Sequence, residues 1–273
     1  MNGIEKSGYL SPEIDEWVKK HRSENPEWFR LAEDINSFAQ EQMFLLDVHN
    51  RDYQEILTAT AFVRSHSLYQ GALLMLQRGM VYEAATLVRA EVEAMFVLTA
   101  AAKEMEFAKA YILSEKTQKL RLMKNILRSS SDLQNAIGDD ATWGKVERLK
   151  DKLKKEGITE IQFNDIAKIT EYYDWYTVVY TVLSQLGAHP TPRSLDQHLQ
   201  VDSEGDIKSL LCGPNIYGIA SLLSTAVECF IIILNSVSAL FEMNWDENLN
   251  TYHDRLKGLT KTSKPLLFGH KST

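Results

Sequence analysis

One stretch of the chain is apolar on nearly every side of the helix that it would form. Between residues 80 and 103 the apolar positions occur on all faces of a helix instead of along one stripe: Val81, Leu87, Val88, Val92, Met95, Phe96, Val97 and Leu98. A helix with this pattern is stable in water only when other elements cover it on all sides. We therefore expect residues 80–103 to form a helix at the centre of the protein.

A second helix is expected directly before it, from about residue 52 to residue 78. Gly79 stands where a helix commonly ends in a left-handed residue, so the two helices predict a central antiparallel pair joined by a short turn. In the first of them Arg64 falls within a stripe of apolar residues spaced by three and four, which predicts that Arg64 faces the core. The stripe consists of Leu57, Ala61, Leu68, Ala72 and Met75.

Helical periodicity accounts for most of the remaining chain, and no strand-like alternation competes with it. The 13 Gly and 6 Pro residues are few for 273 residues, which disfavours a turn-rich β architecture. We predict an all-α protein, a single large helical bundle with the central antiparallel pair and an outer layer of charged helices. Further helices are expected at about 12–21, 26–48, 105–128, 141–156, 165 or 170 to 186, 217–243 and 246–258.

The length of the chain is compatible with one large domain that carries additions at both ends. We expect an N-terminal helical extension over residues 1–50, a core helical bundle over 51–243, and a C-terminal short helix and tail over 244–273.

Nothing near the N-terminus resembles a signal peptide, and Cys212 and Cys229 form neither a Cys-x-x-Cys motif nor a disulfide framework. Residues 219–241 are long and apolar enough to cross a bilayer, but Glu228 and Asn235 lie inside them. A buried core helix explains this segment better. We therefore expect a cytoplasmic protein without a membrane partner.

Charge is distributed unevenly along the chain. The formal net charge is −7, whereas residues 103–155 contain 13 Lys and Arg against 8 Asp and Glu. A local basic surface that follows the phosphates of RNA is one interpretation of this region. Two solvated helix faces are the other, since charged residues normally occupy exposed helical positions.

Three charged residues interrupt the apolar central helix. Arg89 and Glu93 stand four residues apart, and Glu91 lies between them on an adjoining face. Buried charges need partners, and we expect these from Arg64, Glu228 and His189. Such a cluster is either a binding site inside the bundle or an ion-pair network that fixes the packing of the helices.

Several enzyme classes lack their motifs in this sequence. No Glu-x-x-His occurs for a di-metal carboxylate centre, no Gly-x-Ser-x-Gly for a hydrolase, and no Gly-rich phosphate loop before a helix. We expect neither a metal nor a cofactor.

Residues 180–198 contain the remaining candidates for catalysis. Four residues separate Arg193 from His198, and His189 lies just upstream. Metal-free cleavage of RNA needs a general base and a cation, and one Arg with one or two His can supply both. In the alternative interpretation the two histidines only form hydrogen bonds within a loop.

Two groups of residues resemble a widespread bacterial family that is known only as a domain of unknown function. The first comprises residues 69–74 and 82–89 with Glu93, and the second comprises Ser184 and the stretch from His189 to Leu195, which reads His-Pro-Thr-Pro-Arg-Ser-Leu. The resemblance extends over about residues 50–240. It implies an all-helical fold and supplies no established activity.

Arg193 and His198 also resemble the Arg-x4-6-His motif of the HEPN superfamily, although the polar residue after the arginine is here Ser194 and in that superfamily is usually asparagine. Many members of that superfamily are ribonucleases of toxin and phage-defence systems, and they act as dimers. Their motif lies at the start of a helix, a placement that Pro192 suits.

Two functional hypotheses follow. In the first, the protein is a binding or scaffold module that forms a homodimer or another homo-oligomer, or binds a protein partner, through the aromatic residues 172–180, with Tyr180 among the binding residues. In the second, it is a HEPN-like ribonuclease that uses Arg193, His198 and His189. Exposed aromatic side chains would favour the first hypothesis, because interfaces are enriched in aromatics.

Overall fold

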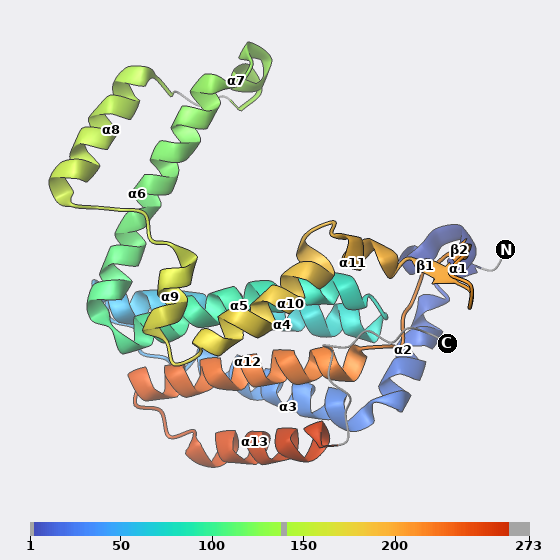
Figure 1. Ribbon diagram of the computed structural model, residues 1–273. Coiled ribbons are helices and arrows are strands. Elements are labelled where there is room, and N and C mark those ends of the chain that lie inside the picture. The colour runs from blue at the N-terminus through green and yellow to red at the C-terminus, as the bar shows by residue number, and fades with distance from the viewer. Residues whose placement is uncertain (1–2, 138–140, 262–273) are drawn as a thin grey trace.

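A computed structural model of the protein describes residues 3–137 and 141–261. It confirms the all-α fold and the central antiparallel pair, α4 (Tyr53–Gln77) and α5 (Val81–Lys103), which pack along one another (Figure 1). The other helices of the bundle are α1 (Gly3–Ser7), η1 (Gly8–Leu10), α2 (Ile14–Glu24), α3 (Pro26–Met43), α9 (Phe163–Ile169), α12 (Ile219–Leu240) and α13 (Asp246–Thr260).

Local sequence explains where the central pair begins and turns. The side chain of Asp52 caps α4 by accepting hydrogen bonds from the backbone N–H groups of Gln54 and Glu55, at 2.9 and 3.0 Å. Gly79 adopts φ +72° in the turn before α5, as its position after the apolar stripe predicts. The boundaries of α4 and α5 agree with the predicted ones to within about two residues, whereas α3 ends at Met43, five residues before its predicted end.

α5 is enclosed on every side over its second half. All seven of its residues from 95 to 101 are buried, and a helix with seven consecutive buried residues is covered on every side. α4, α12, α9 and the segment 181–188 supply this cover. The prediction of a central helix is therefore confirmed.

α12 fills the other side of the core, as the predicted buried helix. It is the one described helix that is long and apolar enough to cross a membrane by length and composition. Here it packs against α3, α4, α5 and α13. Tyr69 of α4 stacks on its Phe230 with the ring centroids 4.5 Å apart, and the Tyr69 hydroxyl donates to the carbonyl of Ala32 in α3. α3 and α13, which lie in the expected N- and C-terminal additions, thus contribute to the same core.

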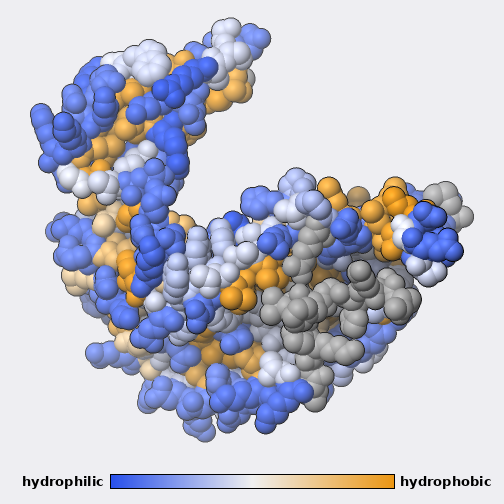
Figure 2. Space-filling model, viewed as in Figure 1, coloured by the Kyte–Doolittle hydropathy of each residue, from blue (hydrophilic) through white to orange (hydrophobic). Residues whose placement is uncertain are grey.

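The charged helices were expected to form an outer layer on the bundle, and this expectation is wrong: they form an arm that stands out from it. The arm consists of α6 (Met105–Arg128), α7 (Ser131–Ile137) and α8 (Trp143–Glu156), and it stands out because α8 packs on α6 and not on the bundle. Val146 and Leu153 of α8 are buried, as are Met123 and Ile126 of α6, with which α8 packs. In Figure 2 the face between the arm and the bundle is hollowed.

The expectation that no strand would occur is wrong for one short hairpin. β1 (Leu199–Val201) and β2 (Ile207–Leu210) pair antiparallel, with a register shift after Gln200. All four residues of β2 are exposed, so neither face of the strand needs apolar side chains. The sequence therefore lacks the alternation of apolar and polar residues that indicates a half-buried strand.

Candidate functional site

The charged residues of α5 point to two different sides of that helix. Arg89 and Glu93 meet the helical segment 175–188, whereas Glu91 lies next to Cys229 of α12. The single polar cluster expected from the sequence is therefore divided in two. Only the half with Arg89 and Glu93 reaches solvent.

Arg89 is the centre of a network of four side chains, hereafter the Arg89 network, completed by Glu93, Tyr180 and Ser184. Nε of Arg89 donates to Oγ of Ser184 at 2.8 Å, and Nη2 donates to the Tyr180 hydroxyl at 2.5 Å. The same Nη2 lies 3.1 Å from Oε1 of Glu93, and the Tyr180 hydroxyl donates to that oxygen at 3.0 Å. These charge-assisted hydrogen bonds join α5 to the segment 175–188.

Partial burial sets the electrostatics of the network. The side chains of Arg89 and Glu93 are 19% and 35% exposed, so the ion pair is shielded from water without being sealed from it. Burial raises the pKa of Tyr180, and the carboxylate of Glu93 raises it further. The phenol therefore keeps its proton at neutral pH and can donate to Glu93.

The segment that carries Tyr180 and Ser184 has an unusual backbone. It consists of two π-helical stretches, η2 (Trp175–Tyr180) and η3 (Ser184–Ala188), on either side of α10 (Thr181–Leu183). Tyr180 ends η2 and Ser184 begins η3. Because π-helical turns are rare and often occur at functional sites, this backbone supports the assignment of the network as a candidate site.

Close packing of backbone on backbone fixes η3 against α5. A Cβ atom added to Gly187 would lie 2.5 Å from the carbonyl oxygen of Tyr82 and 2.9 Å from the backbone nitrogen of Thr86. Only glycine fits this approach.

Aromatic rings continue from the network along the same segment. The ring centroids of Tyr173 and Tyr176 are 5.9 Å apart, and those of Tyr176 and Tyr180 are 5.4 Å apart. Phe163 of α9 packs against Tyr180 at 5.4 Å. We refer to the side chains of the segment as the aromatic face: Tyr172, Tyr173, Trp175, Tyr176 and Tyr180.

Glu91 is buried completely on the opposite side of α5. Among the described residues neither of its carboxyl oxygens has a hydrogen-bond partner, although the thiol of Cys229, a weak donor, lies beside it. Burial raises the pKa of Glu91 well above its usual value, so the carboxyl group is neutral in the folded protein. Burial also raises the pKa of Cys229 well above the usual value of a thiol, and Glu91 adds to this effect.

Two of the expected partners of Arg89 lie elsewhere. Arg64 is exposed, so the prediction that it faces the core is wrong; the buried face of α4 runs through Thr58, Phe62, Ser65 and Tyr69 instead. Glu228 is exposed on α12, on the side where His253 of α13 is its electrostatic neighbour.

The structure places His189 and His198 on the surface. His198 follows α11 (Pro192–Asp196), its ring packs edge-on against Tyr82 at 5.8 Å, and its Nδ1 lies 3.4 Å from the carbonyl of Leu211. Arg193 lies at the start of α11, but its side chain is outside the described part of the structure. No described contact joins either histidine to Arg89, so the third expected partner is also absent from the network.

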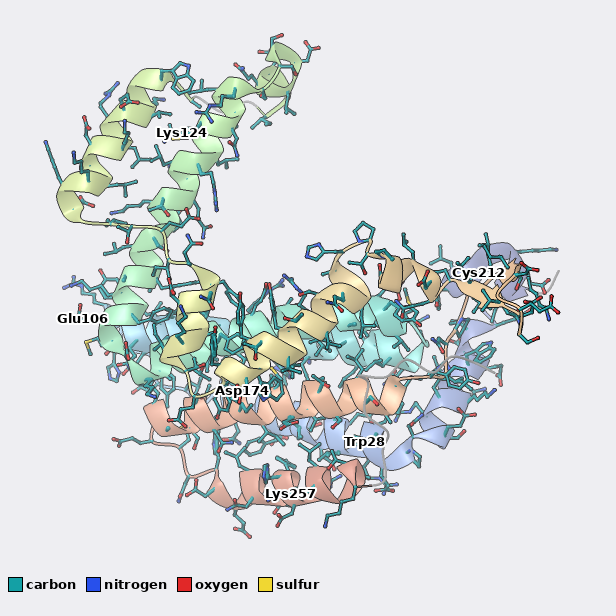
Figure 3. The ribbon with its side chains drawn as sticks, in the orientation of Figure 1. Trp28, Glu106, Lys124, Asp174, Cys212 and Lys257 are labelled. Carbon is teal, nitrogen blue, oxygen red and sulfur yellow. The ribbon has the colours of Figure 1, made fainter. Side chains whose placement is uncertain are left out.

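Part of the positive charge of residues 103–155 is matched by nearby carboxylates. Lys116 pairs with Glu156 at 3.3 Å, and Arg121 pairs with Glu160 at 2.9 Å. Figure 3 shows Lys124 on the arm and Asp174, the residue directly before η2, on the bundle, with the two residues well separated. The region therefore combines basic positions with ion pairs between the segments of the arm.

Three participants were not predicted from the sequence: Ser184 as a partner of Arg89, Phe163 beneath Tyr180, and Cys229 beside Glu91. The spacing of Ser184 could have indicated its role. Tyr180 and Ser184 are four residues apart, as Arg89 and Glu93 are on α5, so each pair lies on one face of its helix and the two faces can meet. A cavity of about 610 Å³ between α3 and α13 is lined by none of the predicted site residues. In residues 3–137 and 141–261 no group of three potential metal ligands comes together.

The residues of the Arg89 network lie inside the region that a family model matches. A family of unknown function (DUF5677) matches residues 55–207, more than half of the chain, and the chain belongs to this family. The match extends from α4 to the start of β2 and includes both sides of the network. No curated protein and no solved structure matches the chain.

Tyr180→Phe should reduce the free energy of unfolding by about 1 kcal/mol, because the hydroxyl both accepts from Arg89 and donates to Glu93. In a double-mutant cycle with Arg89→Met, urea unfolding followed by circular dichroism should give a coupling of about 1 kcal/mol. Tyr173→Phe is the matched control, since it removes an exposed hydroxyl of the same segment. Strictly additive effects of the two substitutions would contradict the network.

Glu91→Gln should make stability less dependent on pH. The pKa of Glu91 is raised in the folded state, so the unfolded chain releases this proton at a lower pH than the folded chain does. The free energy of unfolding of the wild type therefore falls as the pH rises above about 4.5, by at most about 1.4 kcal/mol per pH unit. The Gln variant lacks this loss. Urea unfolding between pH 5 and 8 measures the difference, with Glu83→Gln, an exposed position of α5, as the control. Parallel curves for wild type and Glu91→Gln would show that Glu91 is ionised in the folded protein.

Proposed function

We propose that the protein is a binding module that associates with a protein partner or with a second copy through its aromatic face. One observation carries the proposal: Tyr173 is exposed, and the other four aromatic side chains between residues 172 and 180 pack against the core on one side and stay partly open to solvent on the other. Side chains of this type at the surface are typical of the centres of interfaces.

The packing of the aromatic face suits it to recognition. Tyr173, Tyr176 and Tyr180 are stacked on one another, so their rings lose little further freedom when a partner binds. The Arg89 network and Gly187 fix the segment against α5 from behind. Because the Arg89 network also reaches solvent, it can supply polar contacts beside the apolar rings.

A photo-crosslinking residue tests the proposal. Val178 lies in η2 and is 47% exposed, so p-benzoylphenylalanine at this position should crosslink to one discrete protein in cells that naturally produce the chain. Tyr173→Ser with Tyr176→Ser in the same chain should reduce that product at least fivefold. The same experiment on purified protein shows whether the captured protein is a second copy.

The matched control places the crosslinker at Leu122 of the arm, which is 56% exposed. Equal products from both positions, or a product that survives the two serine substitutions, would refute the aromatic face as the binding surface.

A second candidate function, a HEPN-like ribonuclease of a toxin or phage-defence system, is favoured by one placement. α11 begins at Pro192 and is capped by the side chain of Thr191, so Arg193 occupies the start of a helix and His198 the turn that follows it. This agrees with the resemblance stated above. The basic positions of the arm would be the binding surface for RNA.

Incubation of purified protein with a pool of RNA tests this second function. The wild type should cleave the pool without added metal, and Arg193→Ala and His198→Ala should each lower the rate at least a hundredfold. His253→Ala, which changes an exposed histidine of α13, is the control. Intact RNA with the wild type, or equal cleavage by all variants, would exclude the ribonuclease.

A further inference from the structure

The stack of tyrosines in the aromatic face has an arginine at one end and none at the other. The rings of Tyr173, Tyr176 and Tyr180 follow one another, with angles of 26° and 17° between the planes of successive rings. The guanidinium carbon of Arg89 lies over the ring of Tyr180, 4.6 Å from its centroid. In the described part of the chain no Lys or Arg side chain lies over Tyr173 or Tyr176. Tyr173 is 38% exposed, so this end of the stack is open to solvent.

Arg89 shows what kind of group this surface accepts. Its flat guanidinium lies over a tyrosine ring, and its N–H groups donate to Oγ of Ser184 and to the hydroxyl of Tyr180 at the same time. The face of an aromatic ring attracts a cation in this position. A lysine ammonium is a compact, strongly hydrated point charge and has no flat face to lay on the ring. The same arrangement at the open end of the stack therefore calls for an arginine from outside the described chain.

The segment around the stack is acidic. Residues 163–188 contain three acidic residues and one lysine, and therefore carry a net charge of −2. The lysine, Lys168, is already paired with Asp165 at 3.0 Å. Rows of aromatic rings also bind the bases of single-stranded nucleic acid, but such a ligand brings a phosphate with each base. The negative charge of the segment favours a cationic protein partner over nucleic acid.

Two carboxylates lie within two residues of Tyr173 in the sequence. Asp174 is exposed, and its side chain forms no ion pair or hydrogen bond with the described residues. Glu171 lies 3.5 Å from Lys103, and its side chain is 82% exposed. An exposed ion pair of this kind contributes little to stability, so Glu171 can exchange Lys103 for another cation. Arginine donates to carboxylates through parallel N–H groups, which suits it to this position.

We propose that the aromatic face recognises an arginine of its protein partner, whose guanidinium stacks on Tyr173 and donates to the carboxylates of Asp174 and Glu171. The partner's arginine repeats at one end of the stack the arrangement that Arg89 has at the other. This inference rests on the proposed function, because it names the chemistry that the aromatic face selects. A partner held by apolar contact alone would need neither the ring nor the carboxylates.

Fluorescence anisotropy with labelled peptides tests the preference for arginine. The probes are two short, flexible peptides of equal charge, one with arginine residues and the other with lysine at the same positions. The full chain should bind the arginine peptide about threefold more tightly than the lysine peptide, because only a guanidinium stacks on the exposed ring. A labelled single-stranded oligonucleotide is the third probe, and its binding should not depend on Tyr173.

Variants at two exposed positions separate stacking from general attraction between charges. Tyr173→Leu keeps an apolar side chain but removes the ring, so the preference for arginine over lysine should disappear, whereas Tyr173→Phe should keep it. Asp174→Asn should weaken binding of the arginine peptide about threefold. Asp254→Asn, which removes the same charge from an exposed position of α13, is the matched control and should leave binding nearly unchanged. Folding is not at risk, because all these side chains are exposed.

The crosslinker at Val178 tests the same chemistry on the partner itself. Tyr173→Leu and Asp174→Asn should each reduce the crosslinked product, and Tyr173→Phe should not. In the captured protein, substitution of the arginine nearest the crosslinked position by lysine should reduce the product as well.

Other outcomes overturn the inference. Equal binding of the two peptides by the wild type, or a preference that survives Tyr173→Leu, means that no guanidinium stacks on this ring. An oligonucleotide that is weakened more than the arginine peptide by Tyr173→Leu would identify the face as a surface for nucleic acid. A crosslinked product that survives Tyr173→Leu and Asp174→Asn but is lost with Tyr173→Ser and Tyr176→Ser together would come from apolar contact. That result would support the proposed function while removing this inference, whereas the absence of any product from Val178 would remove the proposed function, so the two failures are distinguishable.

Discussion

The burial of α5 on every side of its residues 95–101 is the constraint on which the remaining structure depends. A helix that is apolar on every side cannot lie at the surface, so α4 and α12 cover part of it and the segment from α9 to η3 covers another part. The last of these covers is irregular, with π-helical turns on both sides of a short α-helical stretch. It meets α5 at Arg89 and Glu93, and the Arg89 network is thus the polar part of an otherwise apolar contact.

The sequence predicted the helices because their signals are local. The cap at Asp52, the turn at Gly79 and the apolar periodicity of α4 and α5 each act within a few residues, and together they defined the central pair. The hairpin of β1 and β2 has no such signal, because its exposed residues need no alternation. The π-helical turns were also not predictable, since they arise from the fit of a whole segment to α5, including the close approach at Gly187.

The site was predictable in part, and the errors have a common geometric origin. Arg89 and Glu93 were correctly paired, because a spacing of four places two side chains on one helical face. Arg64 was wrongly expected to face the core because it lies at the edge of the apolar stripe along α4, a helix of 25 residues. A position at the edge of such a stripe is rotated about the helix axis by less than a third of a turn from its centre, so the spacing alone does not separate a buried position from an exposed one. Which residues from distant segments would meet Arg89 depended on tertiary packing, so Ser184 and Phe163 were not identified.

A small rotation at the base of the arm would displace the far end of the arm by a much larger distance. α6 is one continuous helix of 24 residues, about 36 Å long, and only its first turns pack on the bundle. A rotation of about 10° at its base would move the far end by about 6 Å, since a rigid helix transmits the whole angle. Small rearrangements where α6 leaves α5 are therefore converted into large displacements of α7 and α8, and the width of the hollow beside the bundle is set by the packing of a few residues at its base.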